Sequence, residues 1–559
     1  MSKVIIYQIF TRLFGNKKKT CKQNGTYEDN GCGKMSFFDK DVLKQIKDLG
    51  VTHVWYTGII RHASKTSYAK YGLPKQHPAI VKGTAGSPYA IVDYYDVDPD
   101  LADHIDKRMD EFNALVKRTH QADLKVIIDF VPNHVARQYH SIEKPKGVID
   151  LGEKDDVNMH FSVNNNFYYC TNAPFSPHID LYAGEAEPYT EFPAKATGND
   201  CFNNSPDMND WYETVKLNYG IDYCDAGGKS EHFSPIPDTW FKMRKILLFW
   251  AAKGIDGFRC DMAEMVPWQF WKWAIAGVKK LYPDIVFIGE VYNPSLYRTY
   301  IASGFDYLYD KVGMYDCMKE VICHRQPASA ITPQWQAVDD IHQHILYFLE
   351  NHDEQRIASP YFAGNALKAI PAVAVNALMR ENPFMIYAGQ EYGEPGMDHE
   401  GFSGTDGRTT IFDYWTVKSL FAGYINRKEL TTEQKQLEAL YTQILNIAKT
   451  EKSVSDGLFF DVMYANYNNG QFDAASLYAF IRKYKDEMLI VVANFSANEK
   501  ECSLRLPQHA FDYLQLPEGD FDAKELLSST NCHFSLMPDG YIPVHINGNS
   551  ASILKFAFK

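Results

Sequence analysis

The sequence lacks several features that would have assigned it to a class at once. Its ten cysteines include no CxxC pair and no spacing typical of a zinc site, so reduced, non-ligating thiols are expected. No stretch approaches the roughly 20 apolar residues of a membrane helix, and the first residues lack the apolar run and cleavage site of a signal peptide. We therefore expect no membrane partner and a cytoplasmic location, although a secreted chain whose leader had been removed would look the same.

Positive charge is also in short supply. The chain has 57 Lys and Arg against 70 Asp and Glu, a formal net charge of −13, and its conspicuous basic cluster is only residues 17–19. Proteins that bind nucleic acids usually carry a basic patch or stripe that neutralises phosphates. The composition therefore predicts no nucleic-acid partner.

Aromatic residues, in contrast, make up 14% of the chain, with 36 Tyr and 9 Trp. Flat rings with polar edges suit ligands that present an apolar face and polar edges, and sugars are ligands of this kind. A large aromatic core would explain most of the same residues.

Apolar, β-branched runs alternate with longer amphipathic stretches from the N-terminus to about residue 450, as in βα units around a parallel sheet. Helices are predicted at residues 41–47, 105–120 and 239–253, with a closing helix at 432–448. The predicted strands are residues 4–9, 53–56, 126–130, 257–261, 286–290, 305–309, 345–349 and 384–387. Eight such strands predict an α/β fold of the TIM-barrel type, a closed (β/α)8 barrel.

Two segments fall outside this pattern. Residues 135–234, after the third predicted strand, are far longer than an ordinary βα loop and predict an inserted subdomain that walls the active site. Residues 470–559 break into short alternating runs separated by Gly, Pro and Asn, which is typical of an antiparallel β-sandwich. The barrel is therefore expected to comprise residues 1–134 and 235–469.

The segment from Gly257 to Asp261 has two distinct faces. At the two-residue period of a strand, Gly257, Arg259 and Asp261 point one way, whereas Phe258 and Cys260 point the other. The apolar face suits packing against helices, and the polar face would line a site. A buried structural ion pair between Arg259 and Asp261 explains the same pattern equally well.

Four predicted strands end in polar residues at the C-terminal rim, where the catalytic groups of (β/α)8 barrels gather. The four segments are residues 129–134 (DFVPNH), 259–261 (RCD), 288–290 (IGE) and 350–353 (ENHD). In this order and on these strands, they resemble the four short regions of the alpha-amylase family of glycoside hydrolases, glycoside hydrolase family 13. Residues 389–391 (GQE) and Tyr89 extend the resemblance over nearly the whole chain.

The resemblance implies retaining hydrolysis of α-glucosidic linkages, mainly α-1,4, in starch- or glycogen-derived glucans and maltooligosaccharides, with no cofactor required for the chemistry. Asp261 resembles the nucleophile, Glu290 the general acid/base, and Asp353 the carboxylate that grips sugar hydroxyls and favours the oxocarbenium-like transition state. We expect Arg259 to lower the pKa of Asp261 and keep it ionised. Glu290 has no basic neighbour in sequence, so we expect nearby carboxylates to raise its pKa and keep it protonated.

Further residues match the family's substrate-binding positions. Tyr89 resembles the ring that stacks on the sugar in the cleavage subsite, and His134 and His352 resemble histidines that hydrogen-bond the sugar there. Arg356 resembles an arginine of members that act on short oligosaccharides, with a structural salt bridge as the alternative. Asp129 is expected behind the site, holding Arg259, or as a structural acid at the rim.

Two features bear on the kind of family member. Residues 214–218 (TVKLN) resemble the fifth region of neopullulanases and cyclomaltodextrinases, which points to tolerance of both α-1,4 and α-1,6 linkages. Typical alpha-amylases place Lys-His soon after the nucleophile, where the histidine carbonyl binds a structural calcium, whereas this chain has Glu264 and Met265. Asn133 resembles another ligand of that calcium, so the resemblance implies a metal site that the departure calls into question.

Two other functions remain open on these motifs. A transglycosylase, or a relative acting on sucrose or trehalose, would use the same carboxylates with a sugar hydroxyl in place of water. A non-catalytic carbohydrate-binding barrel would be expected to lack at least one acid, whereas this chain has all three together with Arg259.

Overall fold

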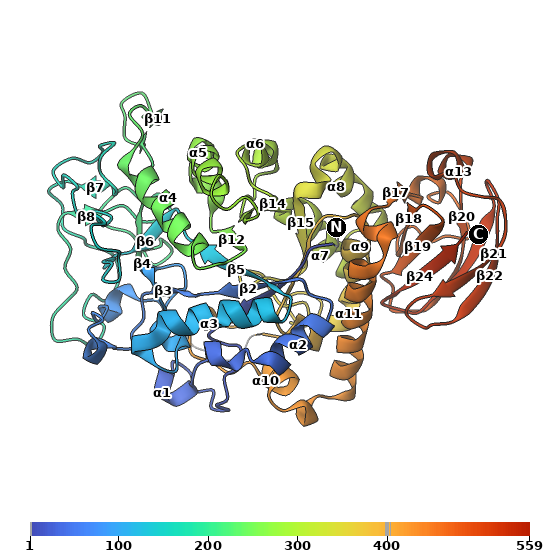
Figure 1. The fold of residues 1–559 in the computed structure, drawn as a ribbon, viewed down its shortest axis with the longest axis horizontal. Helices are drawn as coiled ribbons and strands as arrows, with labels where there is room; N and C mark the ends of the chain where they lie inside the picture. The colour runs from blue at the N-terminus through green and yellow to red at the C-terminus, as the bar shows by residue number, and fades with distance from the viewer. Residues whose placement is uncertain (1–2, 397–401, 403, 559) are drawn as a thin grey trace.

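The computed structural model describes residues 3–396, 402 and 404–558, and at the centre of this part lies a closed barrel of eight parallel strands (Figure 1). Neighbouring strands follow the order β1-β16-β15-β14-β13-β12-β5-β2, so chain order is kept around the barrel. Each of the eight predicted segments supplies one strand, which confirms the (β/α)8 prediction. The barrel strands are β1 (Ile5–Phe10), β2 (His53–Thr57), β5 (Lys125–Phe130), β12 (Gly257–Cys260), β13 (Val286–Gly289), β14 (Tyr307–Tyr309), β15 (Ile345–Phe348) and β16 (Phe384–Tyr387).

Helices begin where the sequence offers capping groups. The Asp39 side chain accepts the backbone N–H groups of Asp41 and Val42 at the start of α2, and Thr431 and Gln434 form a reciprocal capping box at the start of α11. The four predicted helices are found as α2, α3, α4 and α11, with ends within a few residues of those expected. The α-helices are α1 (Tyr27–Asn30), α2 (Lys40–Asp48), α3 (Arg108–Gln121), α4 (Asp238–Ala251), α5 (Trp268–Lys279), α6 (Tyr297–Ala302), α7 (Asp316–Ile322), α8 (Ile331–Ala337), α9 (Ile370–Leu378), α10 (Lys418–Tyr424), α11 (Thr432–Thr450), α12 (Lys452–Ser455) and α13 (Gln508–Leu514).

Apolar side chains from seven of the strands fill the barrel interior. They are Ile6, Trp55, Ile127, Ile288, Tyr309, Leu346, Phe348 and Met385. On β12 the inward position is held instead by the fully buried Arg259. At this strand the barrel interior therefore contains a buried charged group, which must be paired with acidic or hydrogen-bonding groups.

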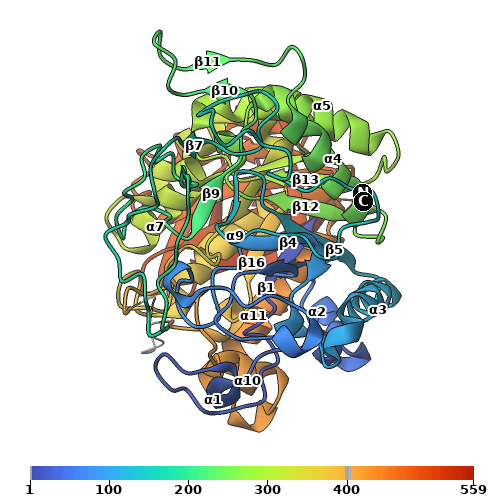
Figure 2. The same ribbon diagram turned by 90° about the vertical axis from the view of Figure 1, so that its left-hand side faces the viewer.

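The segment between β5 and α4 forms the predicted insertion, at the left of Figure 1. Its strands pair as β6 (His134–Ala136) with β9 (Thr214–Lys216), β7 (Tyr169–Cys170) with β8 (Ala194–Lys195), and β10 (Ile221–Asp222) with β11 (Ser230–Glu231). The β10–β11 hairpin extends away from the barrel at the top of Figure 2. Since β6 follows β5 directly, its pairing with β9 brings His134 opposite Lys216 at the barrel rim. A further antiparallel pair, β3 (Ile60–His62) with β4 (Ile91–Val97), follows β2.

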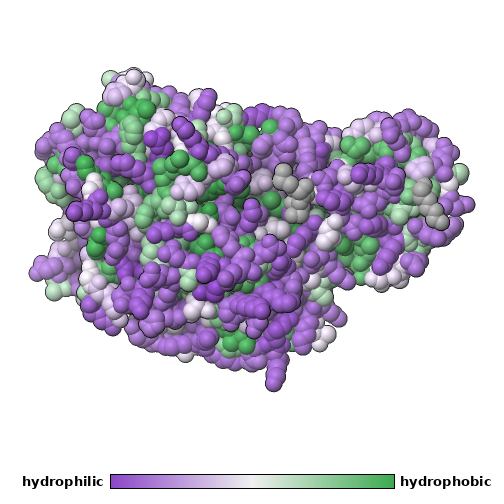
Figure 3. Space-filling view, viewed as in Figure 1, coloured by the Kyte–Doolittle hydropathy of each residue, from purple (hydrophilic) through white to green (hydrophobic). Residues whose placement is uncertain are grey.

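The C-terminal strands form antiparallel sheets, as predicted, and make the lobe at the right of Figures 1 and 3. One sheet has the order β17-β18-β19-β24-β21-β22, and β20 pairs separately with β23. The strand β17 precedes residue 470, the predicted start of this region. The strands are β17 (Leu458–Asp461), β18 (Leu477–Tyr484), β19 (Glu487–Asn494), β20 (Lys500–Arg505), β21 (Gly519–Glu525), β22 (Asn531–Leu536), β23 (Tyr541–Ile546) and β24 (Ser550–Ala557).

The face of the molecule in Figure 3 is largely hydrophilic, with small scattered hydrophobic patches. Within the described ranges, no helix combines the length and apolar character needed to cross a bilayer. The ten cysteines, all within the described part of the chain, form no disulfide with one another.

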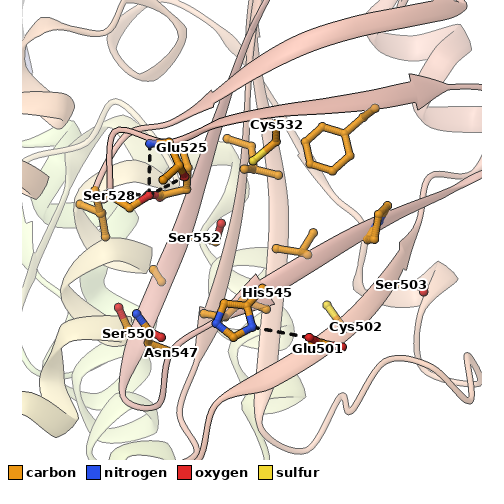
Figure 4. Close-up of a pocket in the computed structure, with 18 of the residues that line it drawn as sticks. Glu501, Cys502, Ser503, Glu525, Ser528, Cys532, His545, Asn547, Ser550 and Ser552 are labelled. Carbon is orange, nitrogen blue, oxygen red and sulfur yellow. Dashed lines mark hydrogen bonds and ion pairs between the residues drawn. The ribbon is translucent and has the colours of Figure 1, made fainter.

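A cavity of about 900 Å³ is lined by residues of both C-terminal sheets (Figure 4). Its polar groups include the His545–Glu501 pair, in which Nδ1 and Oε1 are 4.0 Å apart. The buried carboxylates of the predicted site lie elsewhere, at the barrel rim, so size alone does not identify the functional site here.

Candidate active site

The strand β12 has the two faces that its sequence predicts. Phe258 and Cys260 are fully buried in the main apolar cluster, where the Phe258 ring lies 5.5 Å from that of Phe287. The guanidinium of Arg259 lies inside the barrel, 5.3 Å from the ring centroid of Trp55 and 5.8 Å from that of Tyr309. Aromatic rings therefore flank the Arg259 guanidinium inside the barrel.

The guanidinium of Arg259 bridges two of the predicted catalytic carboxylates. Its Nη1 donates to Asp261 Oδ1 at 2.6 Å, and its Nη2 lies 2.8 Å from Glu290 Oε2. Asp129 Oδ1 lies 3.6 Å from Nη1 on the neighbouring strand β5. All four side chains are buried, so three carboxylates from three adjacent strands converge on one cation.

The electrostatics of this cluster correct the expectation for Asp261. Burial raises the pKa of Asp261 well above its usual value, and the Glu290 carboxyl adds to this, although Arg259 acts to lower it. The prediction that Arg259 keeps the pKa of Asp261 low is therefore wrong, because desolvation of the carboxylate outweighs the ion pair. Glu290 has no basic neighbour in sequence, but Arg259 reaches it from the adjacent strand, a contact that the linear sequence does not show.

The third predicted acid, Asp353, is paired with His352. The ring atom Nε2 of His352 lies 2.9 Å from Asp353 Oδ2, while Nδ1 is 2.7 Å from Gln8 Nε2 on β1. Burial acts to raise the pKa of Asp353, but the His352 ring, with Arg259 as a further contributor, outweighs it and lowers that pKa. The Tyr89 ring stacks on His352 with centroids 5.2 Å apart and lies 5.3 Å from the Arg259 guanidinium. Tyr89 and His352 thus join the cluster.

Asp129 is fixed from two sides in addition to Arg259. Trp55 Nε1 donates to its Oδ2 at 3.1 Å, and the backbone N–H of Gly58 donates to the same oxygen at 3.3 Å. Burial raises the pKa of Asp129, and Arg259 opposes this effect. Its position beneath the rim matches the expectation of an acid that holds Arg259.

His134 is linked to the cluster by a hydrogen bond between its ring and the backbone of Tyr89. The ring packs at 5.3 Å, edge to face, against Trp211 of the insertion. Burial, helped by Lys216 and Lys82, lowers the pKa of His134 to about 3, so the ring is neutral at physiological pH.

Arg356 lies apart from the carboxylates. Its Nη1 donates to Glu350 Oε2 at 2.8 Å, Nε to Thr409 Oγ1 at 2.8 Å, and Nη2 to the Ala388 carbonyl at 3.0 Å. The side chain is 1% exposed and its guanidinium lies 3.8 Å from the Tyr387 ring centroid. This placement corrects the prediction of a substrate contact and supports its alternative, a structural salt bridge.

Comparison with known proteins settles the family. A model of the alpha-amylase catalytic domain matches residues 8–451, well over half of the chain. The chain belongs to the alpha-amylase family. It is accordingly a glycoside hydrolase, and the resemblance drawn from the four strand-end segments is confirmed.

Relatives within the family are distant but cover most of the chain. Alpha-amylase 3 of Dictyoglomus thermophilum is 24% identical over 529 residues, which cover 89% of this chain and 85% of the relative. Neopullulanase 2 of Thermoactinomyces vulgaris is 22% identical over 518 residues, covering 90% and 71%. An alpha-amylase from Geobacillus thermoleovorans, solved in complex with acarbose, has a TM-score of 0.65 at 19% identity and covers 100% of this chain and 98% of that chain.

The calcium site implied by the family is tested by the surroundings of Asn133. Its Oδ1 accepts from Lys216 Nζ at 2.9 Å, and the same ammonium lies 2.5 Å from Asp200 Oδ1. The Asn133 amide nitrogen donates to the Gly198 carbonyl at 2.8 Å. A calcium ion about 4 Å from this ammonium would be repelled by about 8 kcal/mol at an effective dielectric constant of about 20. The residues present therefore do not fit a calcium ion.

Sequence reasoning missed three residues that contact the site. Tyr292 donates to Glu290 Oε1, Gln8 contacts His352, and Met262 donates its backbone N–H to Glu290 Oε2 at 2.7 Å. Tyr292 follows Glu290 by two residues, and Gln8 is a polar residue within an otherwise apolar strand, so both carried a signal. The role of Met262 depends on its left-handed backbone conformation, with φ at 43°. A methionine in the sequence does not predict this conformation.

Proposed function

We propose that this chain hydrolyses α-1,4-glucosidic linkages of maltooligosaccharides and related starch-derived glucans with retention of configuration. Asp261 is the nucleophile, Glu290 the general acid/base, and Asp353 stabilises charge in the transition state. The observation that carries the proposal is the single guanidinium of Arg259 in contact with both Asp261 and Glu290.

That bridge supports retention rather than inversion. Retaining enzymes need their two carboxyl groups about 5 to 5.5 Å apart, whereas inverting enzymes leave room for a water at about 6.5 to 9.5 Å. Two carboxylates held by adjacent nitrogens of one guanidinium favour the shorter spacing. Of the two carboxylate oxygens of Asp261, only Oδ1 accepts a hydrogen bond from a described residue. Oδ2 is therefore left for attack on the anomeric carbon.

The substrate class rests on the surroundings of the acids and on the relatives. Tyr89 and His352 lie beside Arg259 and offer a ring face and polar edges of the kind sugars bind. Relatives bear the names alpha-amylase, neopullulanase and cyclomaltodextrinase. We accordingly include pullulan and cyclodextrins among the substrates to test.

The test compares wild type with Asp261→Asn and Glu290→Gln on maltoheptaose, cyclodextrin and pullulan. Each variant should lose at least a thousandfold in kcat while circular dichroism and Tm stay near wild type. Near wild-type rates in both variants would overturn the proposal. In wild type, NMR of the first products should show the α-anomer, and an initial β-anomer would exclude retention.

The same assay in ¹⁸O-labelled water tests for transfer. Hydrolysis places one labelled oxygen per cleavage, at the new reducing end of the fragment that held the broken bond at its anomeric carbon, whereas transfer to a sugar hydroxyl yields longer, unlabelled oligosaccharides. A predominance of longer, unlabelled oligosaccharides, or turnover of sucrose or trehalose in preference to maltoheptaose, would replace the hydrolase proposal with the transglycosylase alternative.

A further inference from the structure

The hydroxyl of Tyr292 contacts one specific oxygen of Glu290. Tyr292 follows the end of β13, and its Oη donates to Glu290 Oε1 at 2.6 Å. Burial raises the pKa of Tyr292 well above its usual value, and Glu290 raises it further, so the hydroxyl keeps its proton. A tyrosine hydroxyl can both donate to a carboxylate and accept from a carboxylic acid.

The other oxygen of Glu290 is fixed from the opposite side. Oε2 lies 2.8 Å from Arg259 Nη2 and accepts the backbone N–H of Met262 at 2.7 Å. Met262 adopts a left-handed backbone conformation, which is unfavourable for a residue with a side chain and persists where surrounding contacts impose it. The two oxygens therefore differ: Oε2 is tied to a cation and an amide, whereas Oε1 contacts a neutral hydroxyl.

Tyr292 is itself anchored at its backbone by Glu264. Glu264 Oε2 accepts the backbone N–H groups of Tyr292 at 3.1 Å and of Asn293 at 3.0 Å. Glu264 stands on the segment after β12 where typical alpha-amylases carry a lysine, so the departure in sequence links the exits of β12 and β13. Tyr292 is thus held at both ends, by Glu264 at its backbone and by Glu290 at its hydroxyl.

We propose that Tyr292 is a positioning residue that makes Oε1 the proton-transferring oxygen of Glu290. The inference rests on the proposed role of Glu290 as acid/base. When the glycosidic bond breaks, Glu290 Oε1 gives its proton to the leaving oxygen, which keeps the electron pair of that bond, and Asp261 Oδ2 forms the new bond to the anomeric carbon. The Tyr292 hydroxyl then donates to the ionised Oε1 and holds it in place until a water gives its proton to Oε1 and bonds through its oxygen to the anomeric carbon, which breaks the bond to Asp261 Oδ2.

The test is Tyr292→Phe, which removes the hydroxyl and keeps the ring. A donor to the carboxylate favours its ionised form, so its loss lets Glu290 hold its proton to higher pH. The basic limb of the kcat/KM profile, which reports loss of that proton, should move up by about one pH unit. The acid limb, which reports Asp261, should move less.

Leaving groups provide a second readout. Phenyl α-maltoside needs protonation of its leaving oxygen, whereas 4-nitrophenyl α-maltoside needs it much less. We expect Tyr292→Phe to lower kcat about tenfold on the phenyl substrate and by less than about threefold on the nitrophenyl substrate. Equal losses on both substrates, or an unmoved basic limb, would overturn the inference.

Tyr300→Phe is the matched control. The Tyr300 hydroxyl donates to the backbone carbonyls of Glu264 at 3.2 Å and Val266 at 2.9 Å, so it supports the same segment without touching Glu290. The basic limb of the kcat/KM profile of Tyr300→Phe should lie at the same pH as that of the wild type. Glu264→Ala, which frees the Tyr292 backbone, should move the basic limb in the same direction as Tyr292→Phe but less far.

The experiments distinguish failure of the proposed function from failure of the inference about Tyr292. If Glu290→Gln retains hydrolysis, the proposed function falls and the role of Tyr292 falls with it. If Glu290→Gln is inactive while Tyr292→Phe leaves the basic limb and the leaving-group dependence unchanged, only the inference about Tyr292 is overturned.

Discussion

Lys216 donates to Asn133 Oδ1 at 2.9 Å, so a side chain of the insertion supplies positive charge at the rim of the barrel. Lys216 lies on β9 and is 2% exposed, and Asn133 follows β5 and is 1% exposed. The backbone N–H of Leu217 also donates to the Asn133 carbonyl at 2.9 Å. This group of contacts joins the insertion to the barrel at the place where the family resemblance implies a calcium ion.

We expect the stability of the wild-type protein to be indifferent to calcium. Thermal unfolding with a chelator or with added calcium should give Tm values within about 1 °C of each other. Lys216→Met should lower the free energy of unfolding by about 2 kcal/mol, because it leaves Asn133 and the half-exposed Asp200 without their cation. Lys216→Arg, which keeps the charge, is the control and should lose less. A wild-type Tm that rises by several degrees with calcium, and no longer does so in Asp200→Asn, would contradict this account.

Arg356→Met should destabilise the fold rather than weaken substrate binding. Removing one partner of a buried ion pair leaves Glu350 charged and unpaired, at a cost of about 3 to 5 kcal/mol. Denaturant unfolding should show this loss, and Glu350→Gln combined with Arg356→Met should recover part of it. KM for maltoheptaose should stay near wild type below the unfolding transition. A large rise in KM with unchanged stability would restore the substrate-binding role.

Glu391 makes stability depend on pH. It is fully buried, with the Tyr7 hydroxyl on Oε1 and the Gly389 N–H on Oε2, and burial raises its pKa from 4.5 to about 7. Its folded pKa exceeds its unfolded pKa, so its contribution is fully present below about pH 4.5 and is lost as the pH rises through about 7. The loss amounts to about 3 kcal/mol.

Glu391→Gln removes that titration. Relative to wild type, the free energy of unfolding of the variant should rise by about 3 kcal/mol between pH 4.5 and pH 7.5, measured by urea unfolding. Glu518→Gln, at an exposed site in the C-terminal lobe, serves as the control and should follow wild type. A constant difference between Glu391→Gln and wild type across this range would contradict the assignment.

Much of the fold could be predicted from local patterns. All eight barrel strands and the four expected helices appear because their apolar spacing matches the period of the element they form. The convergence of Asp261, Glu290 and Asp353 followed from their shared position at strand ends, since parallel strands bring their carboxyl ends to one rim. What failed were statements about charge: the expectation that Arg259 keeps the pKa of Asp261 low, and Arg356 as a substrate contact, since it forms a buried ion pair with Glu350.

The sequence alone determined the barrel, the family and the set of acids, because strand periodicity and residues at strand ends are local properties that survive without knowledge of neighbours. Only the tertiary structure decided which groups share each charge. Arg259 meets Glu290 from the adjacent strand, Tyr292 meets Oε1 rather than Oε2, and Lys216 meets Asn133 across the insertion. These pairings depend on through-space distances of a few ångströms that sequence separation does not reveal.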